Sequence, residues 1–365
     1  MKRKIALVLA FVLLLTQPVS SMAQNITDSS SVKVKENLQY AFTYTEYTDD
    51  DHSIVRTYRK TDDGEFGVAS SDARREKTKS VLTSLGMSST FVNELSLNDL
   101  EEYADSLQIV SVTSYTKTDA EGKIVNVPEE EAMTRALDPL RPPNIWDGDG
   151  GGESEPTYSG EMTDTYMKLT LIVSYKGDGL YKFSVDAEWL TMPVFRSYDS
   201  LGICAYDVTV ENETRSGWIK YTEKVLYTAN GSYTETNYKH DFVIGNYGGA
   251  FHTVRNNSWM GAAVVFMLPM NSALPSVVTS YTGLAAHFEY KGYVHDLDAN
   301  QRFNVVGSYD HVTYMLTYEP SVTIDLNADP FGVSLSFSLP AYPDISEVKE
   351  TRVVELPTSI DYIPE

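Results

Sequence analysis

The sequence is almost devoid of cysteine, with Cys204 as the only one in 365 residues. A single cysteine excludes any disulfide within the chain, so stability has to come from the burial of apolar side chains. The chain is long enough for such a core, with room for about two domains. Cys204 lies in the alternating stretch ICAYDV. We expect a small buried side chain there rather than a nucleophile, since no partner motif accompanies it.

Long apolar runs are also scarce. The run at residues 5–15 has eleven apolar residues, whereas about 20 are needed to cross a bilayer core. It follows Lys2, Arg3 and Lys4 and leads to small residues that end at Ala23. This layout is typical of a secretory signal peptide over residues 1–23, cleaved near Ala23. We therefore expect a secreted, extracellular protein with no stable membrane anchor after cleavage.

Positive charge is the third deficit. The chain has 29 Lys and Arg against 51 Asp and Glu, for a net charge of −22. Removal of residues 1–23, which hold three basic and no acidic residues, would bring the charge to −25. Nucleic-acid binding depends on basic residues that neutralise phosphates, and anionic membrane surfaces also attract basic proteins. The sequence thus argues against both partners and favours solubility outside the cell.

Familiar catalytic motifs are missing as well. The chain contains no HExxH, no GxSxG and no glycine-rich phosphate loop that carries a lysine, which are the signatures of common hydrolases and nucleotide-binding enzymes. Paired carboxylates for glycoside hydrolysis are defined by distance rather than by spacing, so they stay open. Whether the protein is an enzyme is uncertain from sequence, and we favour a non-catalytic role.

Short helices are predicted near residues 72–107. Apolar residues recur there at steps of three and four, which is the period of a helix. Gly86 is placed to end the first helix, and Ser96 can cap the third, with Asp99 three residues on. The apolar positions are Val81, Leu82 and Leu85, then Val92 and Leu95, then Leu97, Leu100, Ala104 and Leu107.

Short strands flank these helices. The stretches LQYAFTYTEYT and SIVRTYRK precede them, and QIVSVTSYTK and KIVNV follow. All four are rich in β-branched and aromatic residues, which favour strands. Residues 24–137 therefore read as an N-terminal α+β module.

The pattern LGM, then LS, DL and Y, falls within residues 80–115. Together with a signal peptide and a tyrosine-rich β region, it resembles uncharacterised secreted proteins of Gram-positive bacteria. The resemblance implies an extracellular bacterial setting and carries over no active site.

An acidic linker rich in glycine and proline is predicted over residues 138–160. It contains WDGDGGGESEP, whose carboxylates are oxygen ligands of the kind that calcium prefers. An EF-hand loop that began at Asp147 would need a glutamate where Tyr158 stands, so we favour a flexible hinge. No other cofactor is expected. The candidate calcium ligands are Asp147, Asp149, Glu153 and Glu155.

An antiparallel β domain is predicted over residues 161–340. MKLTLIVSY and YKFSVDAEW flank KGDG, which indicates a hairpin with one buried face and one face in water. Asn230-Gly231 predicts a second hairpin, and VSLSFSL has the same alternation. The proline-rich residues 341–365 read as an extended C-terminal tail. The expected water-facing residues of the first hairpin are Lys182, Ser184, Asp186 and Glu188.

The fold class is thus an α+β N-terminal module followed by a mainly-β domain, as an antiparallel β-sandwich or barrel-like structure. The apolar stretch at residues 260–270 fits a central core strand better than a membrane-inserting hairpin arm. A metal site at His287 and Glu289, with His295, Asp296, Asp298 and His311 nearby, is also conceivable, although exposed strand positions explain these residues more simply.

Aromatic residues supply the candidate binding site. The chain has 25 tyrosines, and Trp189, Trp218 and Trp259 lie in the β region. Exposed aromatics on a sheet suit glycans or proteins, and cross-strand packing is the competing explanation. We predict a non-catalytic extracellular binding module for a surface glycan or protein partner. A β-rich pore-forming or membrane-damaging protein is the alternative, and a carboxylate-dependent hydrolase is third.

Overall fold

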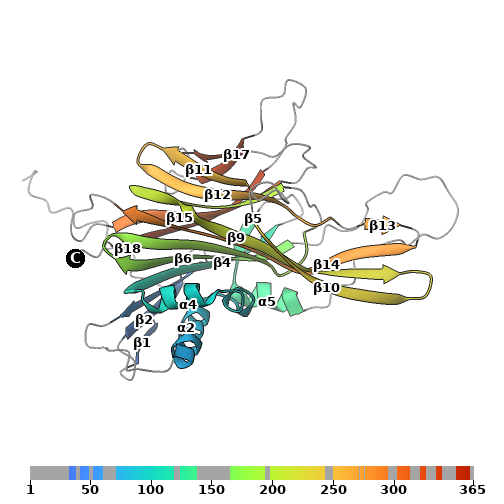
Figure 1. Ribbon diagram of the computed structural model, residues 1–365, viewed down its shortest axis with the longest axis horizontal. Helices are drawn as coiled ribbons and strands as arrows, with labels where there is room; N and C mark the ends of the chain where they lie inside the picture. Colours follow the sequence, from blue (N-terminus) through green and yellow to red (C-terminus); the bar gives the residue numbers. More distant parts are fainter. Residues whose placement is uncertain are drawn as a thin grey trace, which may run out of the picture.

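The fold is mainly antiparallel β-sheet, as predicted. A computed structural model describes residues 33–37, 42–48, 52–60, 71–118, 124–137, 165–193, 198–242, 250–270, 272–274, 276–294, 302–312, 321–325, 334–338 and 351–361. Two open sheets pack face to face like a sandwich, and helices cover the outer face of the larger one (Figure 1). The predicted signal peptide (1–23) and linker (138–160) lie outside the described residues.

The larger sheet runs in the order β1-β2-β3-β4-β6-β7-β14-β9-β10, with β5 paired to β4 and β13 to β14. Its neighbours are antiparallel throughout the described pairs. The strands are β1 (Lys33–Asn37), β2 (Phe42–Thr48), β3 (Ile54–Lys60), β4 (Gln108–Thr118), β5 (Ile124–Val127), β6 (Thr165–Gly177), β7 (Leu180–Trp189), β9 (Val208–Tyr227), β10 (Ser232–Asp241), β13 (Ser272–Leu274) and β14 (Val277–Val294).

The smaller sheet has the order β11-β12-β8-β15-β18, and β16 and β17 form a separate pair. Its strands are β8 (Tyr198–Tyr206), β11 (Ala250–Asn256), β12 (Trp259–Met267), β15 (Arg302–Val312) and β18 (Thr351–Asp361), and the pair is β16 (Ser321–Asp325) with β17 (Ser334–Ser338). The helices are α2 (Ser71–Ser84), α3 (Ser89–Val92), α4 (Leu97–Ala104) and α5 (Glu129–Leu137).

The main core lies between the two sheets. Alternate residues of β6 and β7, such as Leu171, Phe183 and Val185, point into it and are fully buried. They meet side chains from the smaller sheet, including Ile203 and Val264. The period of two in the sequence therefore identified the inner face of this hairpin correctly.

The other face of the hairpin is buried as well, which corrects the expectation of a face in water. Lys182, Ser184 and Asp186 of β7 are all buried. Helices α2, α3 and α4 lie over this face, where Leu82, Leu85 and other helical side chains form a second apolar cluster. Alternation shows which residues share a face, but the helices decide whether that face meets water.

The short helices form where the sequence predicted them. Gly86 ends the first with a φ of 99°, and Ser96 and Asp99 form a capping box at α4. Leu100 and Ala104 are buried. Leu97 in the first turn is 60% exposed and Leu107 is also exposed, so the predicted apolar face is shorter than expected. Leu107 lies beyond the end of α4, where the helical period no longer applies.

Helix α5 was not predicted from the sequence. Three glutamates occupy its first turn and Arg135 its last, an arrangement that complements the helix dipole. Ala132 is fully buried against Tyr115 and Tyr166 of the larger sheet. The prolines that follow the helix favoured a linker in the sequence, although the acidic start and the buried alanine are helix signals.

The N-terminal strands belong to the same sheet as the β domain. Strand β4, inside the predicted module 24–137, pairs with β6, inside the predicted domain 161–340, from Gln108↔Tyr175 to Thr118↔Thr165. The boundary drawn from composition therefore does not interrupt the sheet. At the other end, part of the predicted tail (341–365) pairs with β15 as β18. Its Pro357 is tolerated because β18 is an edge strand.

The apolar stretch at 260–270 contains the core strand β12, the explanation that the sequence favoured. This strand lies between β11 and β8, and Ala262, Val264 and Phe266 are fully buried. Cys204 on β8 is fully buried too, as predicted. Within the described part of the chain, no helix combines the length and the apolar character needed to span a membrane.

Gly261 allows β12 and β8 to approach closely. A Cβ at this position would lie 2.1 Å from the carbonyl oxygen of Ile203 and 2.6 Å from Cα of Cys204. We expect Gly261→Ala to lower the free energy of unfolding by about 1–3 kcal/mol, because the backbone would have to shift. Urea denaturation measures this. Gly231→Asn is the control, since nothing lies within 4 Å there and Asn tolerates a positive φ. A neutral Gly261→Ala would contradict the close approach.

Candidate functional site

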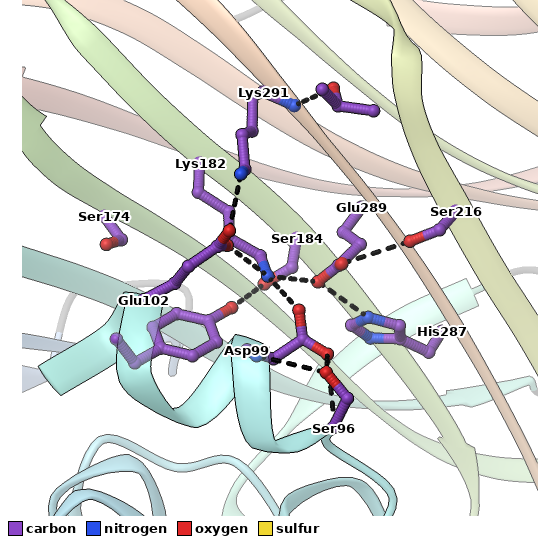
Figure 2. Close-up of polar contacts among 12 residues, drawn as sticks. Ser96, Asp99, Glu102, Ser174, Lys182, Ser184, Ser216, His287, Glu289 and Lys291 are labelled. Atoms are coloured by element: carbon purple, nitrogen blue, oxygen red, sulfur yellow. Dashed lines mark hydrogen bonds and ion pairs between the residues drawn. The ribbon is translucent and has the colours of Figure 1, made fainter.

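A cluster of charged side chains lies between α4 and the covered face of the larger sheet (Figure 2). We call it the charge network. Asp99 and Glu102 come from α4, one helical turn apart, and the remaining members come from the adjacent strands β7 and β14. Alternation along those strands places them on the helix side. The network consists of Asp99, Glu102, Lys182, Asp186, His287, Glu289 and Lys291.

Lys182 is the centre of the network. Its Nζ lies 2.7 Å from Asp99 Oδ1, 3.2 Å from Glu102 Oε2 and 3.1 Å from Glu289 Oε2. The side chain is 2% exposed. It also lies over the ring of Tyr103, with Nζ 5.1 Å from the centroid. The three N–H donors of the ammonium therefore all have carboxylate partners, two from the helix and one from the sheet.

Glu289, His287 and Asp186 continue the network along the sheet. His287 Nε2 lies 3.2 Å from Glu289 Oε2, and Nδ1 lies 2.6 Å from Asp186 Oδ1. Ser216 Oγ donates to the other oxygen of Glu289 at 3.1 Å. Because both ring nitrogens face carboxylates, the ring is held as an imidazolium that donates at each end.

The pKa values express this pairing. Burial alone would lower the pKa of His287, but hydrogen bonds to Asp186 and Glu289 outweigh it and raise the pKa to about 9. Burial alone would raise the pKa of Glu289, but His287 and Lys182 bring it down to about 2. The pKa of Lys182 is raised, since its carboxylates and Tyr103 overcome desolvation. Burial raises the pKa of Asp186 despite His287.

Aromatic rings seal the network. Trp218 stacks on His287 with centroids 5.7 Å apart, and Phe91 of α3 stacks on Trp218 at 5.4 Å. The hydroxyl groups of Tyr103 and Ser184 lie 3.1 Å apart and can hydrogen-bond to each other. These contacts hold the imidazolium in a fixed position away from water.

A second set of ion pairs joins the segment after α3 to β9 and β10, the two strands at one end of the larger sheet. Glu94, just after α3, lies 2.5 Å from Lys220 Nζ and 3.0 Å from Lys239 Nζ. The hydrogen bond from Lys220 lowers the pKa of Glu94 most. Lys239 Nζ also lies over the Trp218 ring, 5.1 Å from its centroid. The helices are thus tied to β9 and β10 as well as to β7 and β14.

His287 and Glu289 are poorly placed to act as general bases. A general base needs a free lone pair within reach of a substrate proton, and both nitrogens of His287 are engaged. Glu289 has a partner at each oxygen. Across the described residues, no group of three or more His, Cys, Asp or Glu side chains is arranged to hold a metal ion. The geometry instead fastens the helices to the sheet.

The three predicted binding tryptophans are buried, which corrects the expected aromatic surface. Their exposed fractions are 5% for Trp189 and 8% each for Trp218 and Trp259. They lie in three different apolar clusters. Cross-strand packing, the competing explanation, accounts for them. Trp189 lies between the two sheets and Trp218 lies under the helices, whereas Trp259 packs with Val254 and Ala263 on the other face of the smaller sheet.

The predicted metal residues have mixed outcomes. His287 and Glu289 do meet on β14, where they form an ion pair with Asp186 and Lys182 as neighbours. His311 belongs to β15 of the smaller sheet, so the structure does not bring it to them. The other candidates are outside the described residues, namely Asp147, Asp149, Glu153, Glu155, His295, Asp296 and Asp298.

Sequence reasoning missed Lys182 and Asp186 as members of a site because they occupied a face expected in water. One signal was present. The three short helices each had an apolar face, and such faces must cover something. A sheet next to them in the sequence, with polar residues opposite its core face, was the available surface.

A projecting arm is the second notable feature. Beyond the sandwich, β10, the residues 220–227 of β9, the residues 277–283 of β14, and β13 continue as one extension of the larger sheet, seen in yellow and orange at the right of Figure 1. We call this extension the arm. The side chains of β10 are exposed or half-buried along its whole length. Asn230 and Gly231 lie in the turn between β9 and β10, as the sequence predicted.

Comparison with known proteins adds no family. No protein-family model matches the chain, and no curated protein matches it either. The candidate site therefore has to be interpreted from its own geometry.

Removal of the central ammonium tests the network. We expect Lys182→Met to lower the free energy of unfolding by about 3–5 kcal/mol, since it removes the ammonium that pairs with the buried Glu289 and the half-buried Asp99 and Glu102. Lys79→Met is the matched control, because Lys79 pairs with Glu76 on the exposed face of α2 and such pairs contribute at most about 1 kcal/mol. Chemical denaturation of both variants gives the comparison. Equal losses would contradict the central role of Lys182.

The pH dependence tests His287. Its folded pKa of about 9 exceeds its ordinary 6.5, so its contribution to stability is complete below pH 6.5 and is lost as pH rises through 9. The contribution is on the order of 3 kcal/mol. Glu289 works oppositely, and its contribution is complete above 4.5 and lost toward 2. We expect the stability difference between the wild type and His287→Gln to be greatest between these limits, at pH 4.5–6.5.

Denaturation curves across pH 3–10 measure this difference. Lys176, whose pKa burial lowers to about 7, titrates in the same range but is present in both proteins, so its effect largely cancels. A difference that stays constant up to pH 10 would contradict a protonated His287.

Proposed function

We propose that the chain is a secreted, non-catalytic binding protein that recognises an extracellular protein through the arm. The carrying observation is the concentration of exposed apolar side chains at the end of the arm. Large exposed hydrophobic residues elsewhere in the described chain are scattered over several elements. Large exposed apolar side chains that gather in one region are a mark of interaction sites. The residues at the end of the arm are Leu226, Tyr227, Tyr233 and Leu274.

The four residues form two apolar pairs at the same end of the arm. Tyr233 pairs with Leu226 across β10 and β9, and Tyr227 and Leu274 both pair with Val277 of β14. Tyr233 is 66% exposed and Leu274 63%. The two pairs lie on opposite faces of the arm. A partner that binds all four residues would therefore contact both faces at the end of the arm. We call these four residues the tip.

A protein partner fits the tip better than a glycan. Sugars stack on aromatic rings that are flanked by polar groups, whereas the tip combines two tyrosines with two leucines. Tyrosine is also enriched in protein interfaces. The tryptophans that would suit a sugar are buried. Glycan binding thus becomes an outcome of the test rather than the proposal.

Two observations support a non-catalytic role over the alternatives. In the charge network, which could have served a hydrolase, both nitrogens of His287 and both oxygens of Glu289 are engaged in pairing. The stretch at 260–270, which could have served a pore-forming protein, is an internal core strand. The arm itself carries Glu223 on one face and the pair Lys224 and Glu235 on the other, and charge on both faces does not suit insertion into lipid.

The test measures binding of the fluorescently labelled, purified chain to intact cells of the bacterium that encodes it. We expect the double variant Leu226→Ser and Tyr233→Ser to weaken binding at least about tenfold, because loss of anchor side chains costs about 2 kcal/mol or more. Treatment of the cells with protease beforehand should abolish binding by the wild type.

Leu97→Ser is the matched control, since Leu97 is 60% exposed, between Leu226 at 41% and Tyr233 at 66%, but lies on α4. It should bind like the wild type. Equal binding by the tip variant and the control would overturn the role of the tip. Binding that resists protease and is lost after removal of cell-surface glycans would replace the protein partner with a glycan.

A further inference from the structure

Strand β10 forms the outer edge of the arm. Strand β10 is the last strand of the larger sheet and pairs with β9 on one side. Among the described residues, no strand pairs with its other side. The sequence SYTETNYKHD contains neither proline nor glycine. An edge of this length presents a row of backbone donors and acceptors that can pair with another strand.

The charges of β10 are self-complementary. Two copies of an edge strand can pair antiparallel about a two-fold axis. The residue numbers of any two facing residues then add up to the same value, which is twice the number of the residue on the axis. An axis at Asn237 places Glu235 opposite Lys239 of the second copy, and Lys239 opposite Glu235. Opposite charges in facing positions stabilise a sheet.

Neighbouring registers lack this match. An axis at Glu235 or at Lys239 would bring two identical charges together. An axis at Tyr238 would place Glu235 opposite Asp241 of the second copy. Like charges in facing positions are destabilising, so the charge pattern selects the axis at Asn237 over these alternatives.

We propose that β10 pairs with β10 of a second copy of this chain, antiparallel and centred on Asn237, to form a two-fold symmetric dimer with one continuous sheet. Within each copy Glu235 already lies 2.9 Å from Lys224, and Lys239 lies 3.0 Å from Glu94. In the dimer, Glu235 of one copy also faces Lys239 of the other. The ion pairs within each copy are thereby joined into one row of side chains with alternating charge across the interface. The backbone hydrogen bonds provide affinity, and the row of charges sets the register.

The dimer goes beyond the proposed binding function and does not depend on it. Leu226 and Tyr227 lie on β9 and Leu274 on β13, so they stand behind β10 in the strand order β10-β9-β14-β13. Most of the tip therefore stays available in the dimer. Two tips would then be displayed by one particle, which raises avidity when a partner is anchored on a surface.

Disulfide trapping tests the register. Asn237→Cys places two cysteines in facing positions about 4.5–5.5 Å apart between Cα atoms, within the range of a disulfide. Thr234→Cys is the matched control, since its two copies would be offset by about 20 Å along the strands. Cys204 is fully buried and does not interfere. We expect a covalent dimer from Asn237→Cys under mild oxidation and none from Thr234→Cys.

Charge reversal gives a second, independent readout by light scattering and sedimentation. Glu235→Lys or Lys239→Glu alone should weaken the dimer about tenfold or more at low salt, and the double variant should restore it, because the facing pairs are then reversed but intact. Lys224→Glu is the control. It introduces a repulsion next to Glu235 within one copy, leaves the facing pairs unchanged, and should keep the dimer.

A monomeric wild type at all concentrations would overturn the proposal, as would crosslinking of both cysteine variants alike or a double variant that stays monomeric. If the chain is a monomer whose binding to cells still depends on the tip, this inference fails and the proposed function stands. If dimers form and no binding to cells occurs, the proposed function fails and this inference stands.

Discussion

A buried ammonium surrounded by carboxylates is the interaction on which the rest of the structure depends. Lys182 projects from the middle of the larger sheet and contacts two acids of α4 and one of β14. Taking these charges out of water is unfavourable unless each one finds its partners. The position of α4 over the sheet is therefore narrowly defined, because any displacement would separate the buried Lys182 ammonium from the carboxylates that compensate its charge. Apolar packing of the helices alone would permit more than one arrangement.

The covered polar face of the larger sheet and the arm differ in how much they expose to a ligand. Helices, rings and ion pairs close the polar face of β7 and β14, so the most unusual chemical groups are unavailable to a ligand. The arm has the opposite character, since it carries exposed tyrosines and leucines. This contrast supports the proposal that the protein binds its partner through the arm.

Much of the fold could be predicted from the sequence, because alternation and capping are local signals. The hairpin of β6 and β7, the box formed by Ser96 and Asp99, and the turn at Gly231 all follow from residues close together in the chain. The site could not be predicted in the same way. That Lys182 faces helices rather than water depends on packing between segments about 80 residues apart, and that Trp189 is buried depends on the smaller sheet.

The position of β14 has a consequence for the order in which the chain can assemble. This strand lies between β7 and β9, although it begins only at Val277, whereas β9 ends at Tyr227. Until residue 294 exists, the larger sheet consists of two parts with unsatisfied edges, and His287 and Glu289 are not present to pair with Asp186 and Lys182. Nonlocal strand insertion is slow. A nascent chain would consequently stay incompletely folded for most of its synthesis, the condition in which a polypeptide is most easily threaded through a narrow channel.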